Sequence, residues 1–379
     1  MLAEFLTAAL NQQAMLWRTS PAATELEDVS LGWLRRLMGL PEAFEGVIYD
    51  TASIASLHAL AAAREAAVPG VRDFGLAARA GIGSFRVYCS EHAHSSIDKA
   101  VMLLGLGHRA LRKIPADDRF RMRADALRDA IADDRAAGVA PIAVVATLGT
   151  TSTTSIDPVG EIADICRREG VWLHVDAAYA GVTAIMPEYR AQFDGWEHVD
   201  SIVVNPHKWL FTPRDLSAFY CRRMDVVRQA FSLVPEYLAT AEGTRGVRNL
   251  MDTGIQLGRR FRSLKLWMVL RHFGAEGIRR PSRSTSGWRN SSADGLMRIR
   301  ISSASPRCRS ASCASGPGHV AARPRPTHST RSTSGCSTRS TRPAMYSSLT
   351  RGSTTASPCG LRWVTLAQRS RTSCGPGNC

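Results

Sequence analysis

The chain has 379 residues, of which 44% are hydrophobic and 21% charged, enough for a sizeable buried core. Lysine and arginine exceed aspartate and glutamate by 15 charges, a balance typical of proteins that bind nucleic acid or anionic surfaces. No apolar run reaches the roughly 18 to 20 residues of a membrane span, so an integral membrane protein is not expected.

The excess positive charge is confined to the C-terminal quarter of the chain. Residues 281–379 contain 15 arginines, no lysine and a single acidic residue, Asp294. Residues 1–280 carry a net charge of only +1. The body of the protein is therefore neutral, and we do not expect it to bind nucleic acid.

Helical and strand patterns alternate along residues 1–280. Residues 1–17 are predicted to form an amphipathic helix, and residues 29–40 a helix preceded by a capping box at Thr24 and Glu27. Further helices are predicted at 53–66, 126–138 and 161–170, and strands at 85–90, 142–149, 171–178 and 201–206. This alternation predicts an α/β fold with a mostly parallel sheet covered by helices on both faces.

After residue 280 this pattern stops. Residues 281–379 contain 22 serines and no sustained apolar period. One interpretation is a natural, disordered Arg/Ser-rich extension. The other is a shift of reading frame near codon 280, because shifted GC-rich codons encode mainly Arg, Ser, Pro, Ala, Gly and Cys. The shifted frame permits ordinary acidic sequence over 294–303 and 371–379, which favours the second interpretation.

The cysteines and the N-terminus indicate a cytoplasmic protein. Cys89, Cys166 and Cys221 are scattered through the body, and none of the nine cysteines forms a C-x-x-C pair. The N-terminus has neither a basic region nor a clear cleavage site of a secretory signal.

Two motifs follow predicted strands and contain side chains that could act in catalysis or ligand binding. In NPHKW (205–209), Lys208 stands at the carboxyl end of a strand, where α/β sheets bind ligands. A lysine there can form an imine with a carbonyl, or it can be an ordinary surface lysine. In HVDAAYAG (174–181), Asp176 ends an apolar strand, where it either meets a cation or caps the next helix.

Two further motifs lie at a helix start and after a strand. YDTAS (49–53) leads into a helix, whose free N–H groups can be capped by hydroxyls or can bind phosphate. No Walker A or G-x-G-x-x-G motif accompanies it. His92 and His94 have no clear third ligand near them, so no metal is expected.

Together these groups match the needs of pyridoxal 5′-phosphate. The phosphate of this cofactor favours a helix N-terminus, and its aldehyde needs a lysine. Its ring needs a flat partner, for which His94 is available, and a carboxylate keeps its pyridine nitrogen protonated.

Residues 1–280 resemble the group II pyridoxal-phosphate-dependent decarboxylases, and most of all the aromatic-L-amino-acid decarboxylases. The resemblance is carried by SPAATELEDVSLGWL, DTASIASLHALAAARE, AHSSIDKA, VATLGTTSTTSIDPV, LHVDAAYAG, NPHKW and LGRRFRSLK, in the order of the family. It implies a type I aminotransferase-like fold, a homodimer, and the release of carbon dioxide from an aromatic L-amino acid.

The resemblance also implies roles for individual residues. Lys208 matches the Schiff-base lysine, Asp176 the partner of the pyridine nitrogen, and His94 the histidine stacked on the ring. Tyr237 matches a tyrosine that reprotonates the substrate carbon, from a loop (about 238–249) that reaches the neighbouring subunit. The remaining matched positions are Ala178 and Thr147 beside the ring, Ala52, Ser53, Asn205 and His207 around the phosphate, with His207 also beside the imine.

The chain departs from the family at both ends. It starts after the N-terminal helical segment of the family, and residues 281–379 stand where the family has a small C-terminal domain. We therefore expect a pyridoxal-phosphate-binding domain over 1–280 and a disordered tail over 281–379. Two alternatives stay open, namely a catalytically dead fragment of the family and, less favoured, a non-catalytic protein whose basic tail binds nucleic acid.

Overall fold

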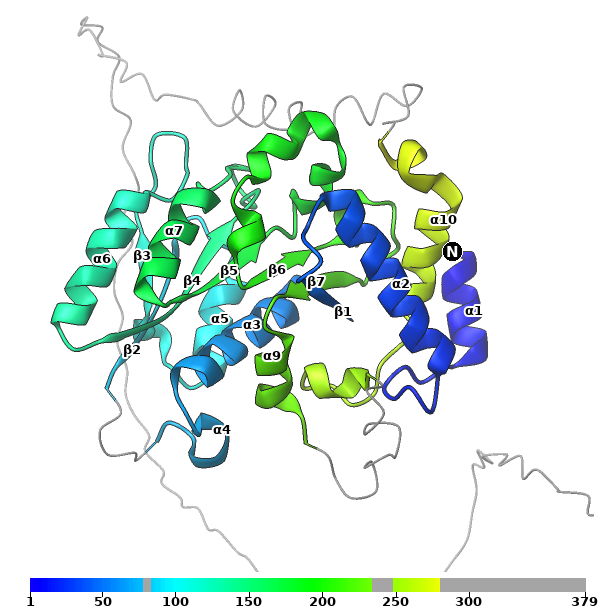
Figure 1. Cartoon of the computed structure of the whole chain (residues 1–379), viewed down its shortest axis with the longest axis horizontal. Coiled ribbons are helices and arrows are strands. Elements are labelled where there is room, and N and C mark those ends of the chain that lie inside the picture. Colours follow the sequence, from blue (N-terminus) through cyan, green and yellow to red (C-terminus); the bar gives the residue numbers. More distant parts are fainter. Residues whose placement is uncertain (78–82, 234–247, 280–379) are drawn as a thin grey trace, which may run out of the picture. The chain divides into compact units, whose positions relative to one another are not determined.

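The computed structural model describes residues 1–77, 83–233 and 248–279, and its strands form one seven-stranded sheet (Figure 1). The predicted tail, 281–379, lies outside the described residues. The strand order across the sheet is β1-β7-β6-β5-β4-β2-β3. The strands are β1 (Glu45–Tyr49), β2 (Phe85–Ser90), β3 (Leu111–Ile114), β4 (Ala140–Thr147), β5 (Trp172–Asp176), β6 (Ser201–Val204) and β7 (Ser217–Cys221).

Helices occupy most of the connections between these strands. The α-helices are α1 (Leu2–Leu10), α2 (Pro21–Met38), α3 (Ala52–Ala67), α4 (Val71–Phe74), α5 (Ser96–Leu103), α6 (Ala124–Ala136), α7 (Val159–Glu169), α8 (Pro206–Trp209), α9 (Met224–Phe231) and α10 (Ser263–Arg279). The 3₁₀ helices are η1 (His108–Ala110), η2 (Gly181–Ile185), η3 (Pro187–Phe193), η4 (Trp196–His198) and η7 (Leu250–Thr253).

The predicted mostly parallel sheet is confirmed. Strands β3, β2, β4, β5 and β6 pair in parallel, and β7 pairs antiparallel with both β6 and β1. The four predicted strands correspond to β2, β4, β5 and β6. Strands β1, β3 and β7, each four or five residues long, were not predicted.

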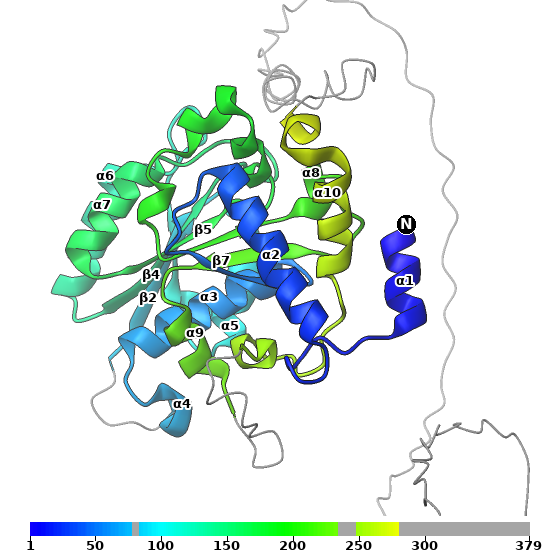
Figure 2. The same cartoon turned by 45° about the vertical axis from the view of Figure 1, so that its right-hand side comes forward.

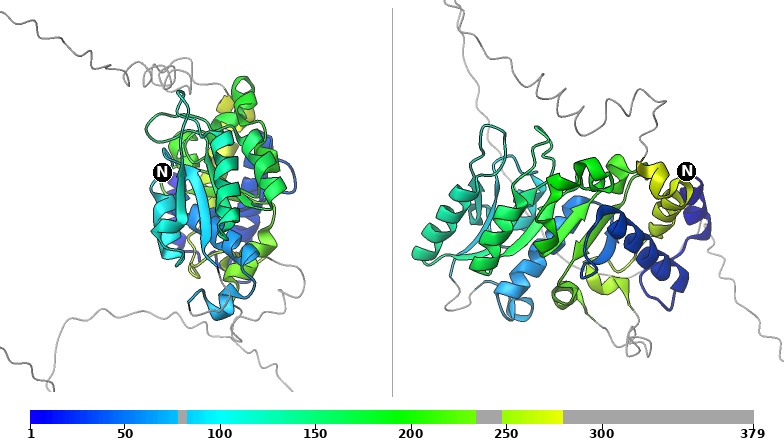
Figure 3. Two further views of the ribbon diagram at one scale, coloured as in Figure 1. Left: turned by 90° about the vertical axis from the view of Figure 1, so that its left-hand side faces the viewer. Right: turned by 45° about the horizontal axis from the view of Figure 1, so that its top comes forward.

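Both faces of the sheet are covered, as predicted (Figure 3). Successive residues of β4 alternate between the two cores: Val144 and Ala146 face one side, and Ala143 and Val145 face the other. The first core includes apolar residues of α2, α6, α7 and α10, and the second those of α3, α5 and α9. None of the described helices has both the length and the apolar character needed to cross a bilayer.

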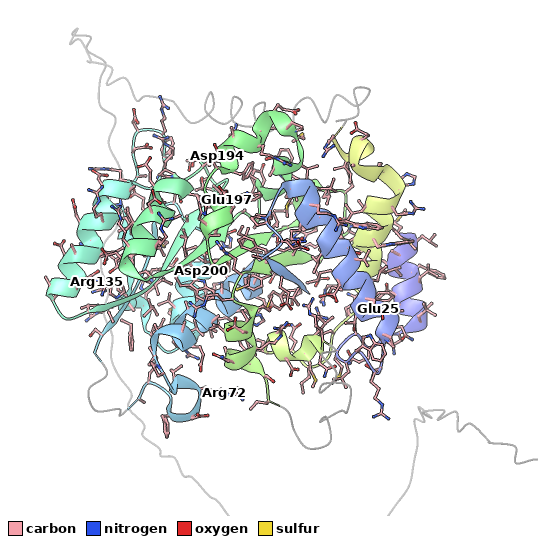
Figure 4. All side chains as sticks on the ribbon, in the orientation of Figure 1. Glu25, Arg72, Arg135, Asp194, Glu197 and Asp200 are labelled. Atoms are coloured by element: carbon pink, nitrogen blue, oxygen red, sulfur yellow. The ribbon has the colours of Figure 1, made fainter. Side chains whose placement is uncertain are left out.

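Helix α2 begins earlier than expected, and its capping differs from the prediction. The helix runs from Pro21 with Ser20 at its N-cap, so Thr24 and Glu27 lie inside it and the predicted capping box is wrong. The Glu27 side chain is instead buried, and its Oε1 accepts hydrogen bonds from Arg259 Nη2 (2.7 Å) and Ile48 N (2.8 Å). Glu25, labelled in Figure 4, remains exposed on the same helix.

The buried Glu27–Arg259 ion pair joins segments that are far apart in the sequence. Arg259 also donates from Nη2 to Ile48 O (2.7 Å) and from Nη1 to Ala14 O (3.1 Å). It therefore connects the N-terminal segment, α2 and β1 with the segment that leads into α10. Helix α10 then packs against α2 and contacts α1 (Figure 2).

Replacing Glu27 with alanine should lower the free energy of unfolding by about 3 to 5 kcal/mol, because Arg259 would remain buried without its partner. Urea unfolding of the full chain, followed by tryptophan fluorescence, measures this loss. Glu25→Ala is the matched control on the same helix and should change the free energy by less than about 1 kcal/mol, since Glu25 is exposed and accepts only a solvent-exposed hydrogen bond from Trp17 Nε1 (3.3 Å). Equal losses in the two variants would contradict the role given to the buried pair.

Candidate functional site

Side chains from six separate segments meet at the carboxyl edge of the parallel strands. Thr147 at the end of β4 pairs in register with Asp176 at the end of β5, which pairs with Val203 in β6. Asn205 follows β6 directly. The end of β1 leads into α3, and His94 lies between β2 and α5. Parallel pairing therefore brings residues distant in sequence to one edge.

These side chains line a cavity of about 230 Å³. All nine residues predicted to bind the cofactor line it, namely Ala52, Ser53, His94, Thr147, Asp176, Ala178, Asn205, His207 and Lys208. Sequence reasoning missed Thr51, Ser96, Gly149, Thr151, Tyr179 and Arg214, which also line it. A larger cavity of about 790 Å³, beside Phe120 and the start of α7, contains none of the predicted residues and no lysine.

Lys208 is the only one of the chain's four lysines that lines this cavity. Lys113 donates to Asp98 Oδ2 (2.9 Å), and Lys265 is buried against Glu4 Oε1 (2.5 Å). Lys99 is exposed on α5, outside the cavity. An amine able to attack a carbonyl in this cavity is therefore the Lys208 Nζ.

The protein environment favours the neutral forms of both Lys208 and Asp176. The surrounding protein lowers the pKa of the Lys208 ammonium, an effect that the Asp176 charge opposes, although the side chain remains open to solvent. Burial raises the pKa of Asp176, against a hydrogen bond that its Oδ1 accepts from Ala178 N (3.1 Å). The site thus combines an amine that deprotonates more easily than usual with a carboxyl group suited to a cationic ligand.

The N-terminus of α3 supplies donors for an anion. Thr51 caps the helix by accepting a hydrogen bond from Ile54 N (3.4 Å) at its Oγ1. The N–H groups of Ala52 and Ser53 stand in the first turn, where no intrahelical acceptor exists. Asn205 Oδ1 accepts from Ser217 Oγ (2.5 Å), so the Asn205 side chain offers its NH₂ group to a ligand. These are the donors that phosphate requires.

Two histidines are oriented by neighbouring backbone. His94 Nδ1 accepts from Ser96 N (3.1 Å) and lies 2.8 Å from Ser96 Oγ, which leaves Nε2 on the other side of the ring. His207 Nδ1 lies 2.6 Å from Leu216 O and 3.1 Å from Leu216 N. Burial lowers the pKa of His207, so its ring favours the neutral form near pH 7.

Small residues allow close approach beside the cavity. Gly149 has a φ of +87°, and a Cβ there would lie 2.8 Å from Ala180 Cβ. A Cβ on Gly181 would lie 2.1 Å from Val204 Cγ1. The segment after Asp176 therefore packs directly on β6 and on the loop that follows β4, which keeps Ala178 at the cavity wall.

One buried hydroxyl at the cavity wall has no partner in the described part of the protein. Thr147 Oγ1 is buried and makes no hydrogen bond. The backbone around it is held by Asp157, whose Oδ2 accepts from Thr147 N and whose Oδ1 accepts from Met122 N, both at 2.7 Å. An unpaired buried hydroxyl is costly, and a polar ligand in the cavity would satisfy it.

The predicted catalytic tyrosine, Tyr237, lies outside the described residues. The other four predicted catalytic residues, His94, Asp176, His207 and Lys208, all line the cavity. The roles of all five remain predictions.

Comparisons with known proteins point to one family. Residues 1–291 match the model of the pyridoxal-dependent decarboxylase conserved domain. The aromatic-L-amino-acid decarboxylase of Sus scrofa is 43% identical over 289 residues, which cover 73% of this chain and 59% of the relative. The histidine decarboxylase of Drosophila melanogaster is 41% identical over 296 residues, which cover 74% of this chain and 34% of the relative.

A solved structure has the same fold. The crystal structure of Oryza sativa TDC with PLP and tryptamine matches with a TM-score of 0.71 and 39% identity, over 75% of this chain and 59% of that one. The chain thus spans about 60% of the length of the aromatic-L-amino-acid decarboxylases and of the rice protein that it matches.

Stability should depend on the ionisation of Asp157. Burial raises the pKa of this carboxyl group to about 6, above its value in the unfolded chain. The folded state therefore holds the proton more tightly, and ionised Asp157 costs stability as pH rises from about 4 to 6. Relative to Asp157→Asn, the wild type should lose up to about 3 kcal/mol of unfolding free energy over this range.

Urea unfolding of the two proteins at pH 4, 5, 6 and 7 measures this difference. Asp164→Asn, which removes an exposed carboxylate from α7, is the control. A constant difference for Asp157→Asn would show that Asp157 ionises normally.

Proposed function

The chain belongs to the family of pyridoxal-dependent decarboxylases, and on this basis we propose that it converts an aromatic L-amino acid to the arylalkylamine and carbon dioxide. The observation that carries the proposal is the cavity at the carboxyl edge of the sheet. It holds the only lysine available to a carbonyl ligand, a buried carboxyl group and a helix N-terminus.

The residues of the cavity fit pyridoxal 5′-phosphate. Ala52 and Ser53 at the start of α3, together with Asn205, would hold the phosphate. Lys208 would attach to the aldehyde carbon, and Asp176 would face the pyridine nitrogen. The unpaired hydroxyl of Thr147 supplies a donor that lacks a partner in the described protein. When bound, the cofactor supplies an electron sink for the bond to the departing carboxylate.

The residues of the chain position the reactants and control protons. The lowered pKa of Lys208 increases the fraction of neutral amine, the form that reacts with a carbonyl. His94 would stack on the cofactor, in an orientation held by Ser96 N. His207 would stand beside the Lys208 amine as a neutral hydrogen-bonding group. Tyr237 would return a proton to the substrate carbon, the role that the family resemblance gives it.

An aromatic substrate is supported by the relatives. The Sus scrofa relative is an aromatic-L-amino-acid decarboxylase, and the rice structure contains tryptamine. Because a histidine decarboxylase is nearly as similar, the assay should include L-histidine beside L-tryptophan, L-phenylalanine, L-tyrosine and L-dihydroxyphenylalanine. A preference for L-histidine would overturn the aromatic assignment and leave decarboxylation in place.

The proposal includes a homodimer in the cytoplasm. The homodimer follows from the resemblance, in which a loop corresponding to about 238–249 completes the neighbouring site. The cytoplasmic location is supported by Cys89, Cys166 and Cys221, which are buried free thiols, as expected in a reducing compartment.

Lys208→Ala should abolish both the imine absorbance of the cofactor-loaded protein and the release of carbon dioxide, because no other lysine reaches the cavity. Lys99→Ala, at an exposed lysine outside the cavity, is the matched control and should leave both unchanged. Imine absorbance that persists in Lys208→Ala would refute the assignment of this lysine. Absorbance without carbon dioxide release in the wild type would favour the catalytically dead alternative.

Mixing two inactive variants tests the shared site. Lys208→Ala and Tyr237→Phe should each fail to produce amine, but a mixed dimer has one site with both Lys208 and Tyr237. After subunit exchange of equal amounts, amine production should return to about a quarter of the wild-type rate, because half of the dimers are mixed and one of their two sites is intact. No recovery, despite exchange shown with tagged subunits, would contradict a site shared between subunits.

A further inference from the structure

His174 is buried in the centre of the sheet, with a hydrogen bond at each ring nitrogen. Its Nδ1 lies 2.9 Å from Ser201 Oγ in β6, and its Nε2 lies 3.1 Å from Ser56 Oγ in α3. Burial lowers the pKa of this imidazole to about 3, so the ring is neutral near pH 7. His174 does not line the cavity, so it has no direct part in the reaction proposed above.

The bonds at the two ring nitrogens join different elements. The Trp172 Nε1–H group donates to Ser201 Oγ (3.0 Å), the same hydroxyl oxygen that lies beside His174 Nδ1. The neutral ring carries one hydrogen, so it donates at one nitrogen and accepts at the other. With either arrangement, His174 of β5 is hydrogen-bonded to Ser56 of α3.

This bond connects the two parts of the cavity that lie on different elements. His174 is two residues before Asp176 on β5, so the two side chains extend from the same face of the strand. Ser56 follows Ala52 and Ser53 by about one turn of α3, on the same side of the helix. The bond thus links the first turns of α3 to the strand that carries the Asp176 carboxyl group.

The described contact between α3 and the sheet includes two directional interactions, namely the Ser56–His174 bond to β5 and an edge-to-face contact of His58 with Tyr49 of β1, whose ring centroids lie 4.4 Å apart. The helix faces the strands with small apolar side chains, including Ala55, Ala59, Ala62 and Ala63. Among the described residues, Ser56–His174 is the only hydrogen bond between α3 and a strand. Flat apolar packing allows a helix to slide by fractions of an ångström, whereas a hydrogen bond with a fixed partner does not.

We propose that His174, through Ser56, is a positioning residue that holds the phosphate-binding start of α3 at the distance from Asp176 that one cofactor molecule requires. The inference rests on the proposed function, since it concerns the same cavity. A ligand that spans both parts gains affinity from their correct spacing, and a fragment that occupies only one part does not. The Ser56 bond should therefore raise the affinity for intact pyridoxal 5′-phosphate and not the affinity for pyridoxal or phosphate alone.

The test measures three affinities of the full chain without cofactor. Pyridoxal 5′-phosphate and pyridoxal are titrated by their absorbance change, and inorganic phosphate by its competition with the former. Ser56→Ala should weaken binding of pyridoxal 5′-phosphate by about tenfold. It should leave the affinities for pyridoxal and for inorganic phosphate within about twofold of the wild type.

Ser30→Ala is the matched control. Ser30 is also a fully buried helical serine, and its Oγ donates to Leu26 O (2.6 Å) in α2, away from the cavity. It removes a buried helical hydroxyl as Ser56→Ala does, and it should leave all three affinities unchanged. If Ser56→Ala does not fold, Ser56→Cys provides the same test, because a thiol is a much weaker hydrogen-bonding group than a hydroxyl.

The outcomes separate this inference from the proposed function. If the wild type binds no pyridoxal 5′-phosphate, the proposed function fails, and the inference fails with it. If the wild type binds and Ser56→Ala binds equally well, only the inference fails. Equal weakening of the binding of pyridoxal 5′-phosphate, pyridoxal and inorganic phosphate would also overturn the inference. Ser56 would then act by destabilising the whole domain.

Discussion

Parallel pairing of β4, β5 and β6 is the constraint on which the site depends. In register, Thr147, Asp176 and the residues after Val204 reach the same edge, so residues separated by up to 60 positions meet without any long loop. Antiparallel β7 begins at this edge, which places Ser217 against Asn205. The start of α3 comes from β1 across the same edge. Backbone pairing between the strands thus determines which residues lie together at the site.

Much of this arrangement could be predicted because its signals are local. Lys208 and Asp176 follow apolar strands, and glycines such as Gly170 end helices. The start of α2 has a local signal, Ser20 before Pro21, that the prediction did not use. The role of Glu27 could not be predicted, because its partner Arg259 lies more than 200 residues away and no local pattern contains it. Arg214 was missed for a similar reason, since it enters the cavity through the tertiary fold and stands in none of the motifs.

Apolar and polar contacts stabilise the domain in different ways. The two cores cover the sheet with aliphatic side chains, which supply cohesion but little geometric definition. A small number of buried hydrogen bonds and ion pairs fixes the relative positions of elements where they must align. Glu27 with Arg259 aligns β1, Asp157 aligns the end of β4, and His174 aligns α3 with β5. Each bond joins elements that contribute to, or directly support, one wall of the cavity.

The scarcity of lysine bears on chemical selectivity. Of the 48 lysines and arginines in the chain, only four are lysines, and two of these are held in ion pairs. A guanidinium stays protonated and does not condense with aldehydes under cellular conditions, whereas an amine does. A protein that handles a reactive aldehyde therefore presents few amines that could trap it in unproductive adducts. Carrying positive charge on arginine leaves Lys208 with little competition from the protein's own side chains.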